Sequence, residues 1–329
     1  MTSHRLDSSA LRPSDLAEQR RLAILDDVRA GFARTPRELP PKYFYDERGS
    51  RLFEAITRLP EYYLTRAERE ILTARADEII DEVRPRTLLE LGAGSAAKTR
   101  ILLGAMRRAV GTVTYVPVDV SEDFLEQTRV ALEREDPGLR VEPVVADIGV
   151  AMEVPANVEP PILFAFLGST IGNFDAPAAI ALLTRVRAQM RLNDRVLLGT
   201  DLRKDPAVLN VAYNDAAGVT AEFNRNMLRV LNAELGANFD PGAFEHRAYY
   251  NEAARRIEMY LHAIGVQLVY IPGMPPVVFR DGEAIRTEVS YKYDRAAVGA
   301  LAATARLRVT RWMTDSANRF ALSLLEPAI

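Results

Sequence analysis

A run of small residues, Gly92-Ala-Gly94-Ser95, directly follows an apolar stretch that predicts a strand over residues 87–91. Glycines at such a position permit a tight turn and let a ligand approach the backbone, while the N–H groups of the next helix face that ligand. Asp119 ends the next apolar stretch and can accept hydrogen bonds from both hydroxyl groups of a ribose. Gly92, Gly94 and Ala97 also satisfy the permissive dinucleotide pattern, so these residues predict a nucleotide site without separating NAD from S-adenosylmethionine.

Two further residues lie where such a site would need them. Asp147 follows a third apolar stretch and can accept a hydrogen bond from an adenine amino group. Lys98 begins the helix that follows the glycines, where it can meet a carboxylate. Each candidate has a purely structural alternative. The glycines would then serve only a turn that needs small residues, and Asp119 would stabilise the start of the following helix. Asp147 would be an ordinary turn residue and Lys98 a solvated surface residue.

The composition excludes several classes of function. The chain has 329 residues, of which 48% are hydrophobic and 26% charged, and it contains no cysteine. Disulfides, thiolate catalysis and cysteine-based metal sites are therefore excluded, and three histidines (His4, His246 and His262) hardly suffice for a histidine-rich metal site or a Ser–His–Asp hydrolase. The formal net charge of −3 favours neither nucleic acid nor an anionic membrane, and no apolar stretch is long enough to span a bilayer. We expect a cytoplasmic protein without a metal, a nucleic-acid partner or a membrane anchor.

Apolar stretches alternate with helical patterns over the middle of the chain. Thr65-Arg-Ala-Glu68 has the form of a capping box and predicts the start of a helix, and Ser121 is placed to cap another. Buried strands separated by helices imply a parallel sheet covered on both faces, which is an α/β fold. Strands are expected at 87–91, 112–118, 141–146, 162–167 and 196–200. One helix is expected at 14–32 and another begins at residue 65. The helix after the glycines ends at residue 108, the helix after Ser121 ends at about residue 133, and a further helix begins near residue 177.

The alternation stops after Asp201, which indicates a two-part organisation. Strand-like patterns then occur at 257–263, 266–271, 287–293, 306–312 and 320–325. We expect a second, α+β lobe to lie over the carboxyl edge of the parallel sheet, where ligands bind in open α/β folds. The expected boundaries are 67–202 and 294–329 for a Rossmann-like domain, 14–66 and 203–293 for the second lobe, and 1–13 for a flexible tail.

Longer motifs follow one another along the chain. They are Pro-Pro-Lys-Tyr-Phe-Tyr45-Asp, Leu-Pro-Glu-Tyr62-Tyr63, Glu-Leu-Gly92-Ala-Gly94, Phe-Leu-Gly168-Ser-Thr-Ile-Gly-Asn173, Leu-Gly-Thr-Asp201-Leu, Tyr213-Asn-Asp-Ala-Ala-Gly218-Val-Thr220, Glu258-Met259 and Thr-Glu288-Val-Ser290. In order and spacing they resemble the histidine Nα-methyltransferases of ergothioneine biosynthesis, over roughly residues 20–325. The resemblance implies a Rossmann-like class I methyltransferase domain with a second α+β substrate-binding lobe. It also implies S-adenosyl-L-methionine as cofactor, S-adenosyl-L-homocysteine as product, a small-molecule amino-acid substrate as the partner, and a monomer.

The activity that the resemblance implies is trimethylation of the α-amine of L-histidine to hercynine, the first step of ergothioneine biosynthesis. Tyr62, Asn173 and Tyr213 would be the catalytic residues and would hold the carboxylate and amine of the amino acid. Glu288 and Ser290 would recognise its imidazole. The other substrate-binding residues would be Phe53, Gly168, Thr220 and Met259, and the cofactor-binding residues would be Tyr45, Gly92, Gly94, Lys98, Asp119 and Asp147.

The chemistry of these side chains agrees with those roles, although each side chain also has a structural alternative. Glu288 and Ser290 share one face of a strand, so the carboxylate can accept an imidazole N–H while the hydroxyl addresses the other nitrogen. An exposed strand face would account for the same spacing, and a turn or core packing would account for Asn173, Tyr62 and Tyr213. The alternatives for the whole chain are an N-methyltransferase of another aromatic amino acid, such as tryptophan, and a non-catalytic nucleotide- or amino-acid-binding protein.

Overall fold

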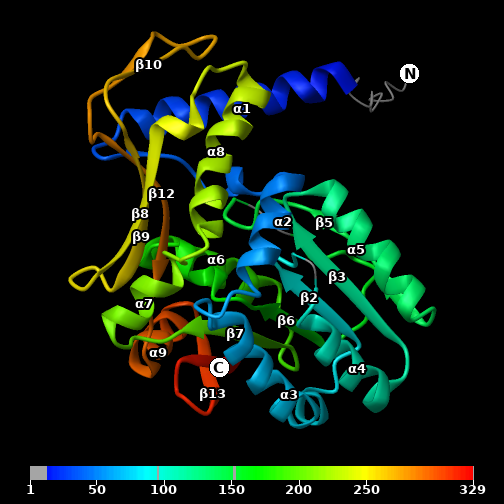
Figure 1. The fold of residues 1–329 in the computed structure, drawn as a ribbon. Helices are drawn as coiled ribbons and strands as arrows, with labels where there is room; N and C mark the ends of the chain where they lie inside the picture. The colour runs from blue at the N-terminus through cyan, green and yellow to red at the C-terminus, as the bar shows by residue number, and fades with distance from the viewer. Residues whose placement is uncertain (1–12, 95, 151–152, 329) are drawn as a thin grey trace, which may run out of the picture.

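The computed structural model describes residues 13–94, 96–150 and 153–328, so the tail expected at 1–13 falls almost wholly outside the described residues. Figure 1 shows a lower part built around a large twisted sheet and an upper part in which long strands run beside a long helix. Within the described ranges, no helix has both the length and the apolar character needed to cross a membrane.

The large sheet is an open sheet in which parallel strand pairs predominate. Its strands are β2 (Thr87–Leu91), β3 (Val113–Asp119), β4 (Leu139–Val141), β5 (Val144–Val145), β6 (Ile162–Phe166), β7 (Arg195–Asp201), β13 (Leu307–Thr314) and β14 (Phe320–Pro327). Their order is β13-β14-β7-β6-β2-β3-β4, with β5 also paired to β3. The pairs from β7 to β4 are parallel, whereas β14 is antiparallel to both of its neighbours. The strand order reverses between β2 and β6, which is the switch point at which such sheets bind ligands.

Helices cover this sheet on both faces, and side chains on both faces of its central strands are buried. In β2, Leu88 belongs to the hydrophobic cluster beneath two helices, and Leu89 belongs to a second cluster beneath two others. Successive side chains of a strand point to opposite faces, so a strand buried on both sides needs a continuous apolar run. The helices are α3 (Leu64–Val83) and α4 (Thr99–Val110) on one face, and α6 (Ala176–Gln189) and α9 (Arg295–Thr304) on the other.

The upper part is organised around a smaller sheet. It contains β1 (Arg37–Glu38), β8 (Phe244–Asn251), β9 (Arg256–Ala263) and β12 (Ala284–Tyr291), in the order β1-β12-β9-β8. β1 comes from the N-terminal segment and pairs in parallel with β12, so the two distant parts of the sequence share one sheet. Helix α8 (Val219–Leu235) packs on this sheet and α1 (Pro13–Phe32) packs on α8 (Figure 1). The remaining elements are η1 (Pro41–Phe44), α2 (Glu47–Ile56), α5 (Glu122–Glu135), η2 (Thr170–Asn173), α7 (Pro206–Ala212), η3 (Pro241–Ala243) and the hairpin of β10 (Gln267–Val269) and β11 (Val277–Phe279).

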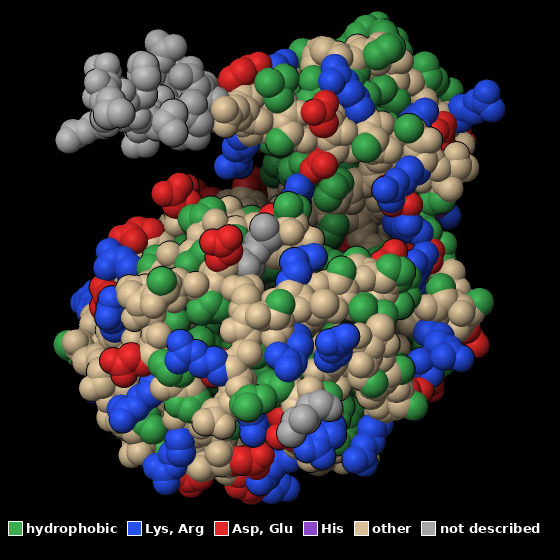
Figure 2. Space-filling view, turned by 180° about the vertical axis from the view of Figure 1, so that it is seen from behind, with side chains coloured by type: hydrophobic (Ala, Val, Ile, Leu, Met, Phe, Trp, Pro, Cys, Tyr) green, Lys and Arg blue, Asp and Glu red, His purple; other side chains and the backbone are tan. Residues whose placement is uncertain are grey.

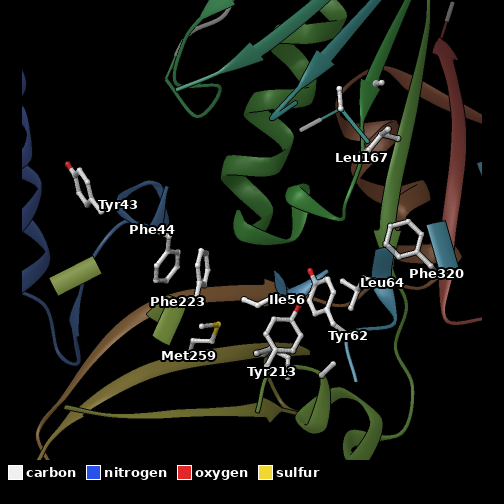
Figure 3. Packing of buried hydrophobic residues seen from close by; sticks show 14 of the residues in the cluster. Tyr43, Phe44, Ile56, Tyr62, Leu64, Leu167, Tyr213, Phe223, Met259 and Phe320 are labelled. Atoms are coloured by element: carbon white, nitrogen blue, oxygen red, sulfur yellow. The ribbon is translucent and has the colours of Figure 1, made fainter. Parts of the chain in front are cut away.

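The two parts share a hydrophobic core. One cluster of buried residues runs from Leu88 and Phe320 in the large sheet to Ile257 in the small sheet, and Tyr62 and Tyr213 belong to it. Figure 3 shows these two tyrosines side by side between the parts, with Met259 and Phe223 nearby. The aromatic residues expected to bind a substrate therefore lie at the junction.

Several local expectations are wrong. The strand expected at 141–146 is split into β4 and β5, because Pro143 has no N–H to donate to the ladder. The capping box at Thr65 is absent, since α3 begins at Leu64 without a side-chain cap and Glu68 is buried elsewhere. Ser121 makes no capping hydrogen bond either. The sequence patterns also missed β8, β11 and α9.

Candidate active site

The glycine loop lies at the carboxyl end of β2 and needs its glycines. Gly92 and Gly94 have φ values of +70° and +50°, which residues with a Cβ rarely adopt. A Cβ built on Gly94 would meet no atom within 4 Å, so open space adjoins the loop. Lys98 immediately precedes α4. This arrangement agrees with a ligand-binding turn between a strand and a helix.

Asp119 lies beside this loop at the carboxyl end of β3. Its Oδ2 accepts from the Gly94 N–H at 3.2 Å, and its Oδ1 accepts from the N–H groups of Val120 and Ser121 at 2.8 and 3.3 Å. Burial raises the pKa of the Asp119 carboxyl, while these three N–H groups act in the opposite direction. The residue thus stabilises the local turn, as the structural alternative predicts. Carboxylate oxygens have several lone pairs, so this role leaves it able to accept from a ligand as well.

Asp147 follows β5, next to β3, and connects the sheet to the N-terminal segment. Its Oδ1 accepts from the Gly149 N–H at 2.9 Å, and its Oδ2 lies 3.4 Å from Lys42 Nζ. Lys42 also forms an ion pair of 2.9 Å with Asp27 of α1. Lys42 therefore bridges both parts of the molecule at the nucleotide edge of the sheet.

A buried carboxylate, Glu68 of α3, organises the other side of this edge. It is fully buried, and its two oxygens accept from the Gly168 N–H at 2.9 and 3.0 Å. It also pairs with Lys98. Gly168 itself has a φ of +72° and follows β6. Glu68 thus contacts two of the expected site residues, Gly168 and Lys98. These contacts take the place of the helix-capping hydrogen bond that the sequence pattern predicted for Glu68.

Asn173 and Glu288 face one cavity of about 240 Å³ between the two parts. Figure 2 shows the surface hollowed where the upper part of the molecule meets the lower part. Asn173 ends η2, after the Gly168 turn, and Glu288 lies on β12. Among the described residues, neither side chain has a hydrogen-bond or ion-pair partner. Burial raises the pKa of the Glu288 carboxyl to about 7, although the Lys292 ammonium acts to lower it.

The register of the small sheet places Met259 beside Glu288. Met259 of β9 is the direct cross-strand partner of Glu288, and a bulge between Arg286 and Glu288 sets this pairing. Residues directly opposite each other on antiparallel strands share a face. No irregularity separates Glu288 from Ser290, so Ser290 lies on that face as well.

Tyr213 and Ser290 belong to a buried polar network. Tyr213 Oη lies 3.0 Å from Ser290 Oγ, and Lys292 Nζ lies 2.9 Å from the first oxygen and 2.8 Å from the second. Lys292 also forms an ion pair of 2.9 Å with Asp201 at the end of β7. Asp201 has a second partner, Lys204, at 2.6 Å. Burial opposes the charge on Asp201, but the two lysines hold the pKa of its carboxyl below its usual value.

An aromatic wall lines the junction. The ring centroids of Tyr45 and Phe53 lie 5.8 Å apart, those of Phe53 and Tyr62 lie 6.3 Å apart, and those of Tyr62 and Tyr213 lie 6.2 Å apart, all edge to face. Phe223 of α8 packs against both Tyr45 and Phe53. Burial, together with the negative charge of Glu288, raises the pKa values of Tyr45, Tyr62 and Tyr213 well above the usual value. All three are neutral phenols at physiological pH.

The loop before α8 explains the long motif that begins at Tyr213. Asp215 accepts from the N–H groups of Val219 and Thr220, at 2.8 Å each, and so satisfies the first N–H groups of the helix. Gly218 precedes the helix with a φ of +73°. Thr220 is consequently buried at the helix start.

Sequence reasoning missed four charged residues that support the site: Lys42, Glu68, Lys204 and Lys292. One signal was available. Glu288, Ser290 and Lys292 alternate along the sequence, so the pattern that paired the first two also points to the third. The described residues contain no group of three or more His, Cys, Asp and Glu side chains that could hold a metal ion.

Comparison with known proteins identifies the family. Residues 24–327 match the family described as histidine-specific methyltransferase, SAM-dependent. The histidine N-alpha-methyltransferases of Mycobacterium tuberculosis and Mycolicibacterium smegmatis are 48% and 46% identical to this chain, over 92% of it and 94% of each relative. Ergothioneine biosynthesis protein 1 of Neurospora crassa is 31% identical over 95% of this chain and 36% of that protein. The chain belongs to the family of histidine-specific, S-adenosylmethionine-dependent methyltransferases.

Proposed function

We propose that this methyltransferase adds three methyl groups to the α-amine of free L-histidine and so forms hercynine, the first step of ergothioneine biosynthesis. The observation that carries the proposal is the cavity shared by the Glu288 carboxylate and the Asn173 amide, for which the described residues supply no hydrogen-bond or ion-pair partner. A buried polar group costs free energy unless it is hydrogen-bonded, and an imidazole N–H supplies the missing donor. The names of the relatives from Mycobacterium tuberculosis and Neurospora crassa support the same substrate and pathway.

The residues at the nucleotide edge fit S-adenosylmethionine, which supplies an electrophilic methyl group on its sulfonium when bound. The open space at Gly94 admits a ligand against the backbone, and Asp119 retains lone pairs for ribose hydroxyls. Asp147 and Tyr45 would complete the nucleotide side. Lys98 would exchange part of its contact with Glu68 for the carboxylate of the cofactor.

On the amino-acid side, Asn173 and Tyr213 would hold the carboxylate and amine. The Asn173 amide offers two donors and one acceptor, and the neutral Tyr213 phenol can donate without adding a charge. Tyr62 and Phe53 would form the wall that excludes water. Each methylation removes an N–H donor from the amine, so the carboxylate and the imidazole must hold the substrate through all three steps. Methyl transfer of this kind depends chiefly on the position of the amine lone pair.

The imidazole pocket separates histidine from other aromatic amino acids. Glu288 would accept one ring N–H, Ser290 would address the other nitrogen, and Met259 and Thr220 would shape the remaining wall. The indole of tryptophan would present no ring acceptor to the Ser290 hydroxyl. A site built around polar partners rejects substrates that cannot satisfy them.

The division of labour between the two parts follows from these roles. We infer that 14–66 and 203–293 supply most contacts to the amino acid, that 67–202 and 294–329 supply most contacts to the cofactor, and that the enzyme acts in the cytoplasm. Gly168 and Asn173 are exceptions, since they would reach the amino acid from the cofactor domain.

The test is a mass-shift assay over a panel of free amino acids. Enzyme, S-adenosylmethionine and L-histidine should give a product heavier by three methyl groups, whereas tryptophan and phenylalanine should remain unmodified. No mass change with histidine, or faster methylation of tryptophan, would overturn the proposal. Any turnover with an amino acid would exclude a purely binding role.

A further inference from the structure

Lys292 is a lysine whose side chain is completely removed from solvent at the junction of the two parts. Its Nζ lies 2.9 Å from Asp201 Oδ2, 2.9 Å from Tyr213 Oη and 2.8 Å from Ser290 Oγ. A lysine ammonium has three donors and no acceptor. The three contacts therefore use all of its protons, and each of the three oxygens must accept.

This constraint limits the possible directions of the hydroxyl hydrogen bonds. Tyr213 and Ser290 each have one proton, and Lys292 occupies an acceptor position on both oxygens. When Tyr213 donates to Ser290 across the distance of 3.0 Å, the Ser290 proton is directed away from both partners. When Tyr213 instead donates to a substrate carboxylate, the Ser290 proton is still free to point outward. In both arrangements the Ser290 hydroxyl is available to the substrate as a donor.

The ammonium is held in place from its far side. Asp201 is fully buried, and it accepts from the Tyr63 hydroxyl at 2.8 Å and from Lys204 at 2.6 Å as well as pairing with Lys292. Lys204 also contacts the Tyr63 oxygen at 2.6 Å. Within the described part of the chain, neither Tyr213 nor Ser290 forms a hydrogen bond with Lys204. The two lysines therefore share one carboxylate, and Lys292 is the one that touches the hydroxyl pair.

We propose that Lys292 is a positioning residue that sets substrate specificity by orienting the Tyr213 and Ser290 hydroxyls as donors. This role rests on the proposed function, with histidine as the substrate. The pocket then offers one acceptor, Glu288, and one donor, Ser290, to the ring. A neutral imidazole presents the complementary pair, one N–H and one nitrogen lone pair. Without Lys292, the Ser290 hydroxyl could rotate to accept an N–H. The pocket would then no longer distinguish a ring that has one N–H and one nitrogen lone pair from a ring that lacks the lone pair.

The test compares histidine with an analogue whose ring keeps the N–H and lacks the second nitrogen, 3-(pyrrol-2-yl)alanine. Wild-type enzyme should prefer histidine strongly. In Lys292→Met the KM for histidine should rise more than kcat falls, and the ratio of kcat/KM for histidine over the analogue should drop at least about tenfold, the size of one lost hydrogen bond. Lys204→Met is the matched control, because it removes the other lysine of Asp201 and should leave the ratio unchanged.

Stability is tested separately, since Lys292→Met leaves the buried Asp201 with one partner fewer. The double variant Asp201→Asn, Lys292→Met removes both charges of the pair and should show the same loss of selectivity. Lys292→Arg retains the charge and donors and should restore part of the preference for histidine. A ratio that is unchanged in Lys292→Met and in the double variant would overturn the role of Lys292 alone. Failure of wild-type enzyme to methylate histidine would overturn the proposed function, and this role with it.

Discussion

Replacing Glu288 with glutamine should stabilise the free enzyme while it weakens catalysis. Burial raises the pKa of this carboxyl from 4.5 to about 7. The folded protein therefore holds the proton more tightly than the unfolded chain, and the folded state loses stability as pH rises from 4.5 through 7. The full shift corresponds to about 3 kcal/mol, an upper limit because Glu288 is only half-buried in the free enzyme.

The assay is urea denaturation of wild-type and Glu288→Gln enzyme at pH 5 and pH 8. Ionisation of Glu288 already lowers the stability of the wild-type enzyme slightly at pH 5. The free energy of unfolding of the variant, relative to wild type, should therefore increase by about 2 kcal/mol between pH 5 and pH 8. Glu159→Gln is the control, since Glu159 is exposed in the loop before β6, and surface substitutions usually change stability by about 0.5 kcal/mol or less. Identical pH dependence of the free energy of unfolding in Glu288→Gln and wild type would refute the argument.

The same variant links stability to function. A glutamine keeps the shape of Glu288 but loses the charged acceptor, and hydrogen bonds to charged groups contribute about 1.5–3 kcal/mol. We therefore expect kcat/KM for histidine to fall at least about tenfold in the variant that is more stable at pH 8. Enzymes retain such costly groups where a ligand needs them. A stabilised variant with undiminished kcat/KM for histidine would show that the carboxylate has no role in substrate binding.

Three further predictions concern other residues of the candidate site. Asp119→Asn should weaken binding of S-adenosylhomocysteine about tenfold in calorimetry, because a charged acceptor is lost, whereas Asp123→Asn on the exposed side of α5 should bind normally. Asn173→Ala should raise the KM for histidine about tenfold and leave cofactor affinity within about twofold; equal effects on both would contradict its assignment to the amino acid. Glu68→Gln should lower the free energy of unfolding by about 1–3 kcal/mol, because an amide cannot replace both carboxylate oxygens at the Gly168 N–H and Lys98. Unchanged urea midpoints would show that these contacts of Glu68 do not stabilise the fold.

The parallel sheet was predictable because its signals are local. The fully apolar run at 162–166 and the largely apolar run at 87–91, which includes Glu90, indicate strands buried on both faces. The residues after these runs indicate turns at the ligand-binding edge. The strand at 141–146 failed because a single Pro143 interrupts an otherwise suitable pattern. The missed β8 has one buried residue, followed by partly buried and exposed ones, and includes charged and polar side chains, so it lacks the apolar run of the central strands.

The expected site residues were predicted from motifs, whereas the charged residues that contact them were not predicted. Glu68 looked like half of a capping box because its sequence neighbours fit that pattern. Its real partner, the Gly168 N–H, is 100 residues away, and local spacing carries no information about such contacts. Lys292 shows the same limit, since its partners Asp201 and Tyr213 come from β7 and the segment after α7. Only its alternation with Glu288 and Ser290 was visible in the sequence.

The protonation states of the site bear on how the amine loses its proton. Tyr45, Tyr62 and Tyr213 have raised pKa values, so none of these phenols provides a phenolate base near neutral pH. Glu288 would be engaged by the imidazole and is assigned to the opposite end of the substrate. The amine must then arrive as the free base, or release its proton to water before methyl transfer. We therefore expect log(kcat/KM) for histidine to rise with pH until the α-amine is deprotonated, and the same rise to persist in Tyr62→Phe. A pH profile that loses this limb in Tyr62→Phe would identify Tyr62 as the proton acceptor and refute the argument from its raised pKa.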